Sequence, residues 1–365
     1  MRVRSSDLAV SDPALKSELL DAVDRVLTHG RVLLGPEVDE FEEALADICG
    51  RRYAVGVGSG SEALYFSLRC LDIGAGDEVI TTSLSWIATF NAIAMTGATP
   101  IAIDVREDQN IDPACIEAAI TPRTKAIVVV HFTGRVCEME PIMEIAARRG
   151  LHVVEDAAQA FKACDDQGRR AGSFGVVAAF SMNAIKLFGS YGEAGAVVTD
   201  DSALRERLAT LRYNGTVNRE TCVTVSLNGR LDTLQAAMML VNLHYIDGWI
   251  ERRREIAAEY RRLLGNVVVC PEEPEEIRHV YHTYGILAER RDDLMRWLED
   301  REIEAKIHHP ILMPDQPAYS HLPRPDIPVA RQVVGRILSL PNHEKMSDEQ
   351  VACVTDSVRA FYEAG

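Results

Sequence analysis

Short apolar, β-branched runs alternate with longer amphipathic runs through the middle of the chain. Six runs are typical of strands: Glu78–Thr82, Pro100–Val105, Ala126–Phe132, His152–Glu155, Val177–Ser181 and Ala194–Thr199. Apolar residues at helical spacing separate the first four, at Ile87–Thr96, Pro113–Ile120 and Glu140–Arg149. This alternation predicts an α/β fold with a mainly parallel sheet flanked by helices. Such sheets hold their sites at the carboxyl ends of the strands.

Helical patterns also stand before and after this region. Residues Pro13–Leu27 and Gly35–Cys49 have helical spacing, and so does a long, charged stretch from Asp232 to about Leu264. Within it, we expect a helix around 245–264 that connects two domains. Beyond it, short strand and helix runs lie between prolines. We therefore expect a large domain over residues 1–245 and a smaller C-terminal α/β domain over residues 246–365.

Composition narrows the class of protein. The 365 residues include 39 Lys and Arg against 55 Asp and Glu, a formal net charge of −16. This acidic balance argues against a general affinity for nucleic acid or anionic membrane. No stretch approaches the roughly 20 apolar residues of a membrane span. An anionic substrate would need arginine and lysine gathered locally in its site.

Cysteine usage and the start of the sequence favour a cytoplasmic protein. The eight cysteines are scattered, without a CxxC pair, and residues 1–12 are polar and mixed in charge, unlike a signal peptide. We expect reduced cysteines that mostly pack in the interior, and no metal site.

A glycine- and serine-rich turn runs into a helical pattern at Gly56-Val57-Gly58-Ser59-Gly60-Ser61-Glu62-Ala63-Leu64. Glycines let the backbone approach an anion, and a helix N-terminus directs N–H groups at it. The turn lacks the GK[ST] of a Walker A loop. It is a candidate phosphate cradle, although an ordinary glycine turn with a serine N-cap is the more common explanation of such a turn alone.

Three further features follow predicted strands. One strand ends in Glu155 and Asp156, and strand alternation predicts that one carboxylate points in and the other out; the alternative is that Asp156 only caps the next helix. Ser181 ends another strand, and Lys186 follows in a glycine-rich loop. Burial would lower the pKa of this lysine and let its amine form a Schiff base, although most lysines lie in solvent. Trp86 offers a flat face to an aromatic cofactor, or packs as a core or interface aromatic.

Together these features supply a phosphate cradle, a carboxylate, an amine and an aromatic plate. A phosphate, a ring nitrogen, an aldehyde and an aromatic ring are the corresponding parts of pyridoxal 5′-phosphate (PLP). Lys186 follows Asp156 by 30 residues, which is one strand and one crossover later. The order of the features along the chain therefore favours a PLP site.

The chain resembles the DegT/DnrJ/EryC1/StrS family of sugar aminotransferases over nearly its whole length. The resemblance lies in Gly35–Val38, Gly60–Leu64, Gly76–Ile80, Gly97–Pro100, Ile120–Ile127, Glu155–Ala160, Asn228–Asp232 and Leu338–Pro341. It implies the fold of PLP-dependent transferases of fold type I, with a large PLP-binding domain and a smaller C-terminal domain.

The resemblance also implies roles around the cofactor ring. Lys186 matches the Schiff-base lysine, and Asp156 matches the acid that pairs with the pyridinium nitrogen. Gln159 matches the polar residue near the phenolic oxygen. Trp86 matches the aromatic side chain stacked on the ring.

Further matches concern the cofactor phosphate. Gly60, Ser181 and the backbone N–H groups of Ser61 and Glu62 match the contacts within one subunit. Asn228 matches an asparagine that reaches the phosphate of the partner subunit's cofactor. The resemblance therefore implies a homodimer with shared active sites.

One departure from the family concerns the substrate. His308-His309-Pro310 stands where His-Tyr-Pro is common, near the expected sugar end of the substrate. We therefore take His308, His309 and Arg230 as candidate substrate-binding residues. Arg212 and Arg31 are further candidates for a substrate diphosphate, with a surface position as the equal alternative for each arginine.

The predicted reaction is transfer of an amino group from glutamate to the keto group of a nucleotide-diphosphate-linked deoxysugar. A keto-cyclitol or another carbocyclic ketone is an alternative acceptor. Dehydratases of the same family carry histidine in place of the Schiff-base lysine, so Lys186 argues against that reaction. A non-enzymatic regulator is a third alternative, but the sequence lacks both a helix-turn-helix with a basic face and a basic balance.

Overall fold

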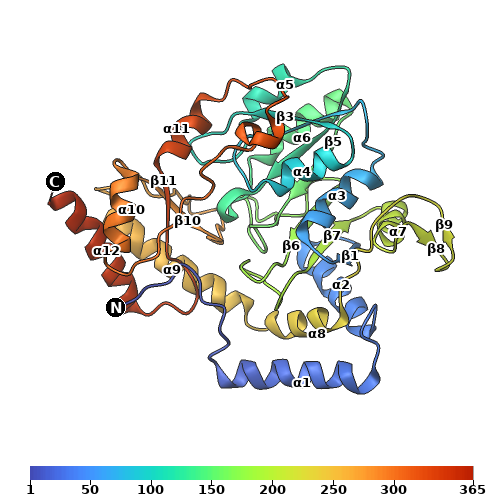
Figure 1. The fold of residues 1–365 in the computed structure, drawn as a ribbon, viewed down its shortest axis with the longest axis horizontal. Coiled ribbons are helices and arrows are strands. Elements are labelled where there is room, and N and C mark those ends of the chain that lie inside the picture. Colours follow the sequence, from blue (N-terminus) through green and yellow to red (C-terminus); the bar gives the residue numbers. More distant parts are fainter. Residues whose placement is uncertain (365) are drawn as a thin grey trace.

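The computed structural model describes residues 1–364, and a seven-stranded sheet forms its centre (Figure 1). The strands, in spatial order, are β1 (Tyr53–Val57), β7 (Gly195–Thr199), β6 (Val177–Ser181), β5 (His152–Asp156), β4 (Thr124–Val130), β2 (Glu78–Thr82) and β3 (Thr99–Ile103). Neighbours from β6 to β3 are parallel, and β7 runs antiparallel to both β1 and β6. The mainly parallel sheet predicted from the sequence is confirmed.

Helices cover both faces of this sheet because its strands are apolar on both sides. Along β5, Val153 packs into one core with α2 (Pro36–Cys49), α6 (Met139–Arg149) and α8 (Thr233–Asn242). Its neighbour Val154 packs into the opposite core with α3 (Gly60–Cys70), α4 (Ala88–Met95) and α7 (Ser202–Leu211). Successive strand residues point to opposite faces, so a central strand such as β5 contributes to both cores.

The C-terminal part has its own core. Its two-stranded sheet pairs β10 (Tyr284–Leu287) with β11 (Ile337–Leu340), beside α9 (Ile246–Leu264), α10 (Arg291–Glu299), α11 (Pro328–Arg336) and α12 (Asp348–Glu363). Val3, at the start of the chain, is fully buried in the same core and bridges to Ile303. The domain boundary at residues 245 and 246 stays a prediction; it coincides with the junction between α8 and α9.

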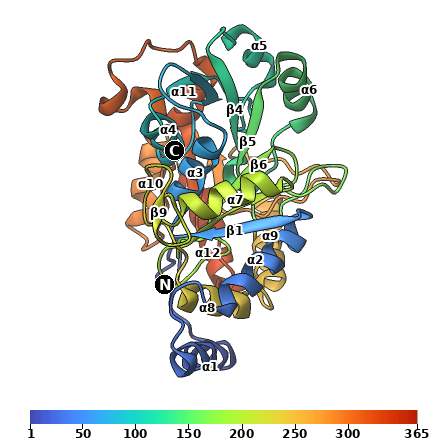
Figure 2. The same ribbon diagram turned by 90° about the vertical axis from the view of Figure 1, so that its right-hand side faces the viewer.

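The remaining elements are peripheral. Helix α1 (Pro13–His29) packs on α8 at the bottom of both ribbon views (Figures 1 and 2). The short α5 (Ile116–Ala119) follows β3, and the hairpin of β8 (Thr216–Val217) and β9 (Thr221–Cys222) projects beside α7 (Figure 1). Within residues 1–364, no helix is both long enough and apolar enough to cross a bilayer.

Two details differ from the sequence-based predictions. Strand β1 was not predicted, since its apolar residues merge with the glycine-rich turn that follows. The helical stretch from Asp232 to Leu264 is divided into two helices, α8 and α9, separated at Leu243–Tyr245, and the helix predicted around 245–264 is confirmed as α9. The end of α8 is held by tertiary contact, because Asn242 Nδ2 donates a hydrogen bond of 3.1 Å to the carbonyl of Gly189.

Candidate active site

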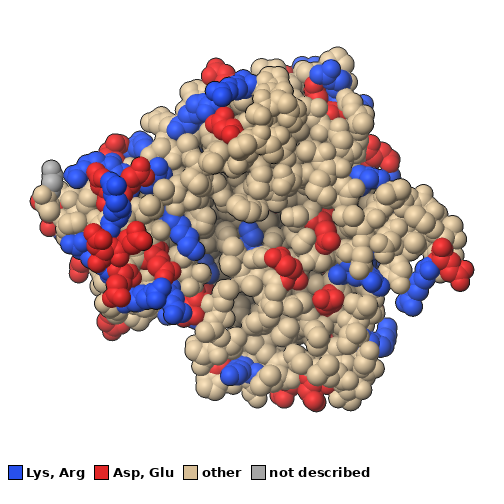
Figure 3. Space-filling view, in the orientation of Figure 1, with Lys and Arg blue, Asp and Glu red and all other residues tan. Residues whose placement is uncertain are grey.

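The carboxyl ends of β5 and β6 bring the main candidate residues together. Asp156 is the last residue of β5 and Ser181 the last of β6, and these strands are direct neighbours in the sheet. Lys186 lies in the loop that follows β6. In space-filling view this face of the molecule is hollowed near its centre, and a basic side chain lies inside the hollow (Figure 3).

Asp156 is a buried carboxylate whose hydrogen bonds come from neutral donors. Its side chain accepts from Thr89 Oγ1 at 2.8 Å and from the N–H of Ala158 at 3.2 Å. Burial raises the pKa of Asp156, and these hydrogen bonds and the charge of Lys186 only partly oppose the rise. A cationic ring nitrogen bound here would offset the cost of burying the charge.

Lys186 is partly buried, and the removal of its amine from water has a chemical consequence. Loss of contact with water lowers the pKa of Lys186, while the nearby charges of Asp156 and Glu193 act in the opposite direction. A lower pKa leaves more of the amine unprotonated, and an unprotonated amine is the nucleophile that a Schiff base requires.

The glycine-rich turn forms the N-terminus of α3 and lies directly against Ser181. A Cβ atom on Gly60 would lie 2.8 Å from Ser181 Oγ, so only glycine allows this close approach. Ser59 caps the helix by accepting from the N–H of Glu62 at 3.2 Å. The first N–H groups of a helix have no acceptor within it, so those of Gly60 and Ser61 are suited to an anion beside the Ser181 hydroxyl.

Gln159 and Trp86 lie on different walls of the same region. Gln159 is buried, and its Oε1 accepts from the N–H of Thr133 at 2.9 Å, which orients its NH2 group as the remaining donor. Trp86 is 58% exposed at the start of α4, and its ring centroid lies 5.6 Å from that of His309. The ring centroid of Phe132, two residues after β4, lies 6.0 Å from that of His309.

His308 and His309 are therefore close to the candidate site despite their distance in sequence. His308 Nδ1 is 2.8 Å from Ser339 Oγ. Burial lowers the pKa of each histidine to about 4, helped by nearby positive charges that include Lys186. Both imidazoles are neutral at pH 7, so they can donate or accept hydrogen bonds without adding charge.

Glu155 has a role separate from that of Asp156. Its carboxylate accepts from His131 Nε2 at 2.9 Å and from the N–H groups of Gly172, Phe174 and Gly175 at 2.6–2.7 Å. Burial acts to raise the pKa of Glu155, but these hydrogen bonds outweigh it and hold the pKa below its usual value. The prediction that one carboxylate points in and the other out is wrong in that both are buried; they contact different partners, and Glu155 holds a loop.

The three candidate arginines differ in how their guanidinium groups are held. Arg230 donates from Nε to Asn228 Oδ1 at 2.8 Å and stacks over the Tyr213 ring, on a segment where Asn228 is exposed. Arg212 is held by Glu42 and donates to the carbonyl of Gly56 at 2.9 Å, so its guanidinium supports β1. Arg31 is exposed, and its guanidinium donates to the carbonyl of Leu34 at 3.4 Å.

Sequence reasoning missed three residues of this region. Thr89 follows Trp86 by three residues, and that helical spacing could have placed it on the same face. His131 follows β4, as polar residues of parallel-sheet sites often do. His282 is buried with no partner for its Nδ1, and burial followed by the charge of Lys186 lowers its pKa strongly. No sequence pattern connects His282 with Lys186.

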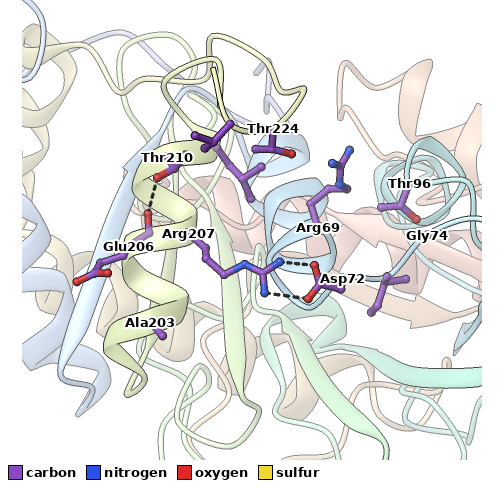
Figure 4. A pocket seen from close by; sticks show the side chains of 12 residues that line it. Arg69, Asp72, Gly74, Thr96, Ala203, Glu206, Arg207, Thr210 and Thr224 are labelled. Atoms are coloured by element: carbon purple, nitrogen blue, oxygen red, sulfur yellow. Dashed lines mark hydrogen bonds and ion pairs between the residues drawn. The ribbon is translucent and has the colours of Figure 1, made fainter. Parts of the chain in front are cut away.

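A cavity of about 800 Å³ lies away from these residues, between α3 and α7 (Figure 4). Its lining includes Arg69, on the last turn of α3, roughly 14 Å along the helix from Gly60. Figure 4 shows Arg207 and Asp72 joined by two parallel contacts, so their charges neutralise each other. The lining of this cavity includes no lysine, and both of its carboxylates, Asp72 and Glu206, are exposed, so size alone does not make it the site.

Comparison with known proteins agrees with this geometry. Residues 13–359 match the model of the DegT/DnrJ/EryC1/StrS aminotransferase family. The chain is 41% identical to dTDP-3-amino-3,4,6-trideoxy-alpha-D-glucose transaminase of Streptomyces venezuelae, covering 99% of this chain and 97% of that protein. It is also 37% identical to a pleiotropic regulatory protein of Geobacillus stearothermophilus, covering 99% of each.

Solved structures give the same answer. The crystal structure of S. venezuelae DesV matches with a TM-score of 0.95 and 41% identity over 99% of both chains. NtdA from Bacillus subtilis, solved with the cofactor PMP (pyridoxamine phosphate) bound, matches with a TM-score of 0.89 and 30% identity, covering 98% of this chain and 83% of that one. The fold is thus that of PLP-dependent transferases of fold type I. The chain belongs to the DegT/DnrJ/EryC1/StrS aminotransferase family, and it is an aminotransferase.

Proposed function

We propose that this aminotransferase binds PLP and transfers an amino group from glutamate to the keto group of a nucleotide-diphosphate-linked deoxysugar. One observation carries the proposal: a buried amine with a lowered pKa, Lys186, and a buried carboxylate with a raised pKa, Asp156, share one site. Burying both groups costs stability in the absence of a ligand, and such perturbed pairs are typical of catalytic sites.

The residues present fit PLP at each of its functional groups. The N–H groups at the start of α3 and the hydroxyl of Ser181 would hold the phosphate, where a Cβ on Gly60 would close the space. Asp156 would pair with the ring nitrogen. Gln159 would donate its NH2 group to the phenolic oxygen, and the exposed face of Trp86 would cover the ring.

Bound PLP supplies an electron sink for the carbanion formed at the α-carbon of the amino donor. Asp156 keeps a proton on the ring nitrogen, because an ionised carboxylate beside that nitrogen favours its protonated form. The amine of Lys186, once free, takes the proton from the donor's α-carbon and returns it on the cofactor side as a general acid. The neutral His308 and His309, with Arg230, would bind the acceptor.

Relatives support the acceptor class. The Streptomyces venezuelae relative is named as a dTDP-aminodeoxyglucose transaminase at 41% identity over nearly the full length of both chains. One relative named as a regulatory protein shares 37% identity. Conversion of a panel of keto-sugar nucleotides and keto-cyclitols, with glutamate as donor and mass as the readout, separates the acceptors. If the protein converts none of these acceptors, the proposal is contradicted.

The decisive variant is Lys186→Ala. It should abolish the visible-edge absorbance of lysine-linked PLP together with all turnover, while Lys125→Ala, an exposed strand lysine, should leave both unchanged. A Lys186→Ala protein that kept the absorbance and the activity would refute the assignment of this lysine.

We also propose that two chains share their active sites. Asn228 is exposed, and neighbouring apolar side chains of its segment are exposed with it: Val217, Val223, Val225 and Leu227. An exposed apolar patch of this kind is typical of an interface. If Asn228 serves the partner subunit's cofactor, mixing inactive Lys186→Ala with weakened Asn228→Ala should form some dimers with one fully wild-type site. Activity of the mixture no higher than the sum of the parts would refute sharing.

A further inference from the structure

A cavity of about 450 Å³ lies against the loop that carries Lys186. The loop at 184–191 forms one wall, and Asn242, Tyr245 and Trp249 at the α8–α9 junction form another. Residues 6–12, which lead into α1, and residues 343–345 close the remaining sides. The segment 6–12 thus lies between the C-terminal part, where Val3 is anchored, and α1 on the large part.

Three buried polar atoms among the lining residues have no hydrogen-bond partner. They are Ser190 Oγ, Arg253 Nε and His343 Nδ1, on side chains that are 4%, 8% and 6% exposed. They come from three different segments of the chain. Leaving one such group unpaired costs about 1–3 kcal/mol, so a cavity lined by three of them is suited to a polar ligand.

The other charged groups of the lining are already engaged. Glu344 accepts from Arg253 Nη2 at 3.1 Å, Asp12 caps α1, and Asp7 accepts from the N–H of Ala9. Lys345 donates to the carbonyls of Asp7 and Ala9 at 2.8 and 2.6 Å, which ties the segment 6–12 in place.

Most of the unpaired atoms in the cavity wall can therefore act as hydrogen-bond donors. Arg253 Nε can only donate, and the hydroxyl of Ser190 can donate. A carboxylate accepts from several donors at once, and hydrogen bonds to a charged acceptor are stronger than neutral ones. The guanidinium of Arg253 is paired with Glu344 through Nη2, so its Nε offers a hydrogen bond rather than an unpaired charge.

We propose that this cavity binds the side-chain carboxylate of a dicarboxylic amino donor, so that Ser190 and Arg253 select glutamate over neutral amino acids. The inference rests on the proposed function, which requires the donor's α-carbon to lie beside Lys186. That lysine is itself part of the lining, and the volume is ample for a five-carbon amino acid.

The first test measures the donor reaction alone. PLP-loaded protein is mixed with glutamate under single-turnover conditions, and the concentration dependence gives an apparent Kd and a limiting rate. Ser190→Ala and Arg253→Lys should each raise the Kd for glutamate roughly tenfold, the effect of losing one charge-assisted hydrogen bond. The limiting rate and the KM for the acceptor should stay within about twofold. Ser202→Ala, an exposed serine of α7, is the matched control.

The second test does not depend on activity. Glutarate, a five-carbon dicarboxylate without an amine, should bind the PLP-loaded protein by calorimetry and change the fluorescence of Trp249 in the cavity wall. Both signals should weaken in Ser190→Ala, which removes one hydroxyl and is expected to fold, even if Arg253→Lys does not.

The outcomes separate the two proposals. Wild-type protein that cannot use glutamate with any acceptor refutes the proposed donor, and with it this subsite. Normal turnover with glutamate, combined with unchanged glutamate and glutarate affinities in Ser190→Ala, overturns the subsite alone.

Discussion

The hydroxyl of Thr89 donates a 2.8 Å hydrogen bond to Oδ2 of Asp156. Thr89 lies on the first turn of α4 and Asp156 at the end of β5, so the bond joins two elements that are 67 residues apart. It is the shortest of the hydrogen bonds to this carboxylate and comes from a neutral donor. Thr89 therefore orients Asp156 without neutralising it, which leaves its charge available to a cationic ring.

Thr89→Val removes this bond and keeps the shape of the side chain. The pKa of Asp156 should rise further, because the bond from Thr89 is the largest influence that opposes burial. We expect kcat to fall about tenfold, the effect of about 1.5 kcal/mol for one hydrogen bond to a charged group. Steady-state kinetics checks this, with Thr96→Val, directly after the same helix, as the control. An unchanged kcat would show that the bond is only structural.

Asp156→Asn should abolish turnover and yet stabilise the protein without PLP. A raised pKa means that the folded state holds the proton of Asp156 more tightly than the unfolded state. At pH 7 the ionised side chain therefore destabilises the fold, and a neutral amide removes that cost. We expect the Tm of PLP-free protein to rise by ~1–3 °C in a thermal scan. A lower Tm would mean that the hydrogen bonds of the ionised Asp156 stabilise the fold by more than the burial of its charge destabilises it.

Glu155→Gln should act in the opposite direction. An amide in place of the carboxylate cannot accept as well from all four donors, and Arg51, at 3.8 Å, loses a counter-charge. We expect a loss of about 2–4 kcal/mol in the free energy of unfolding, measured by urea denaturation. Asp156→Asn is the matched control, because it makes the same carboxylate-to-amide change at the adjacent buried position and is expected to have the opposite effect on stability.

The pH dependence of stability gives a second check on Glu155. Its pKa is lower in the folded state than in the unfolded state, so its contribution is fully present above the unfolded value near 4.5. The contribution is lost as pH falls below that value and through the folded pKa. Wild-type stability should therefore drop more steeply below about pH 4.5 than that of Glu155→Gln. Parallel curves would show that Glu155 makes no pH-linked contribution.

Gly60→Ala should weaken cofactor binding because a Cβ cannot fit between α3 and Ser181. Either the helix start or the serine must move, and the phosphate would lose contacts from one of them. We expect the Kd for PLP to rise at least tenfold in an absorbance titration, equal to the loss of about one charge-assisted hydrogen bond. Gly248→Ala, on a helix with open space around the position, should leave the Kd unchanged.

Local patterns in the sequence were sufficient for much of the fold. Strands β2 and β6 were predicted with their observed bounds, because fully buried parallel strands are short and apolar and are bordered by polar residues. Their order along the chain also indicated which residues follow strand ends, and so Asp156, Ser181 and Lys186 could be proposed as one site. The break between α8 and α9 was missed, because the contact between Asn242 and Gly189 that holds the end of α8 joins distant parts of the chain.

By itself the sequence determined the class of fold, the candidate lysine and acid, and the family to which the chain belongs. Those properties depend on periodicity and on motifs within about 30 residues, where neighbours in sequence are neighbours in space. Only the tertiary structure decided that Thr89 supports Asp156, that His309 lies against Trp86, and that Arg253 and His343 join the cavity beside Lys186. These contacts link segments up to 223 residues apart, and packing of the two parts of the chain, rather than any local preference, brings them together.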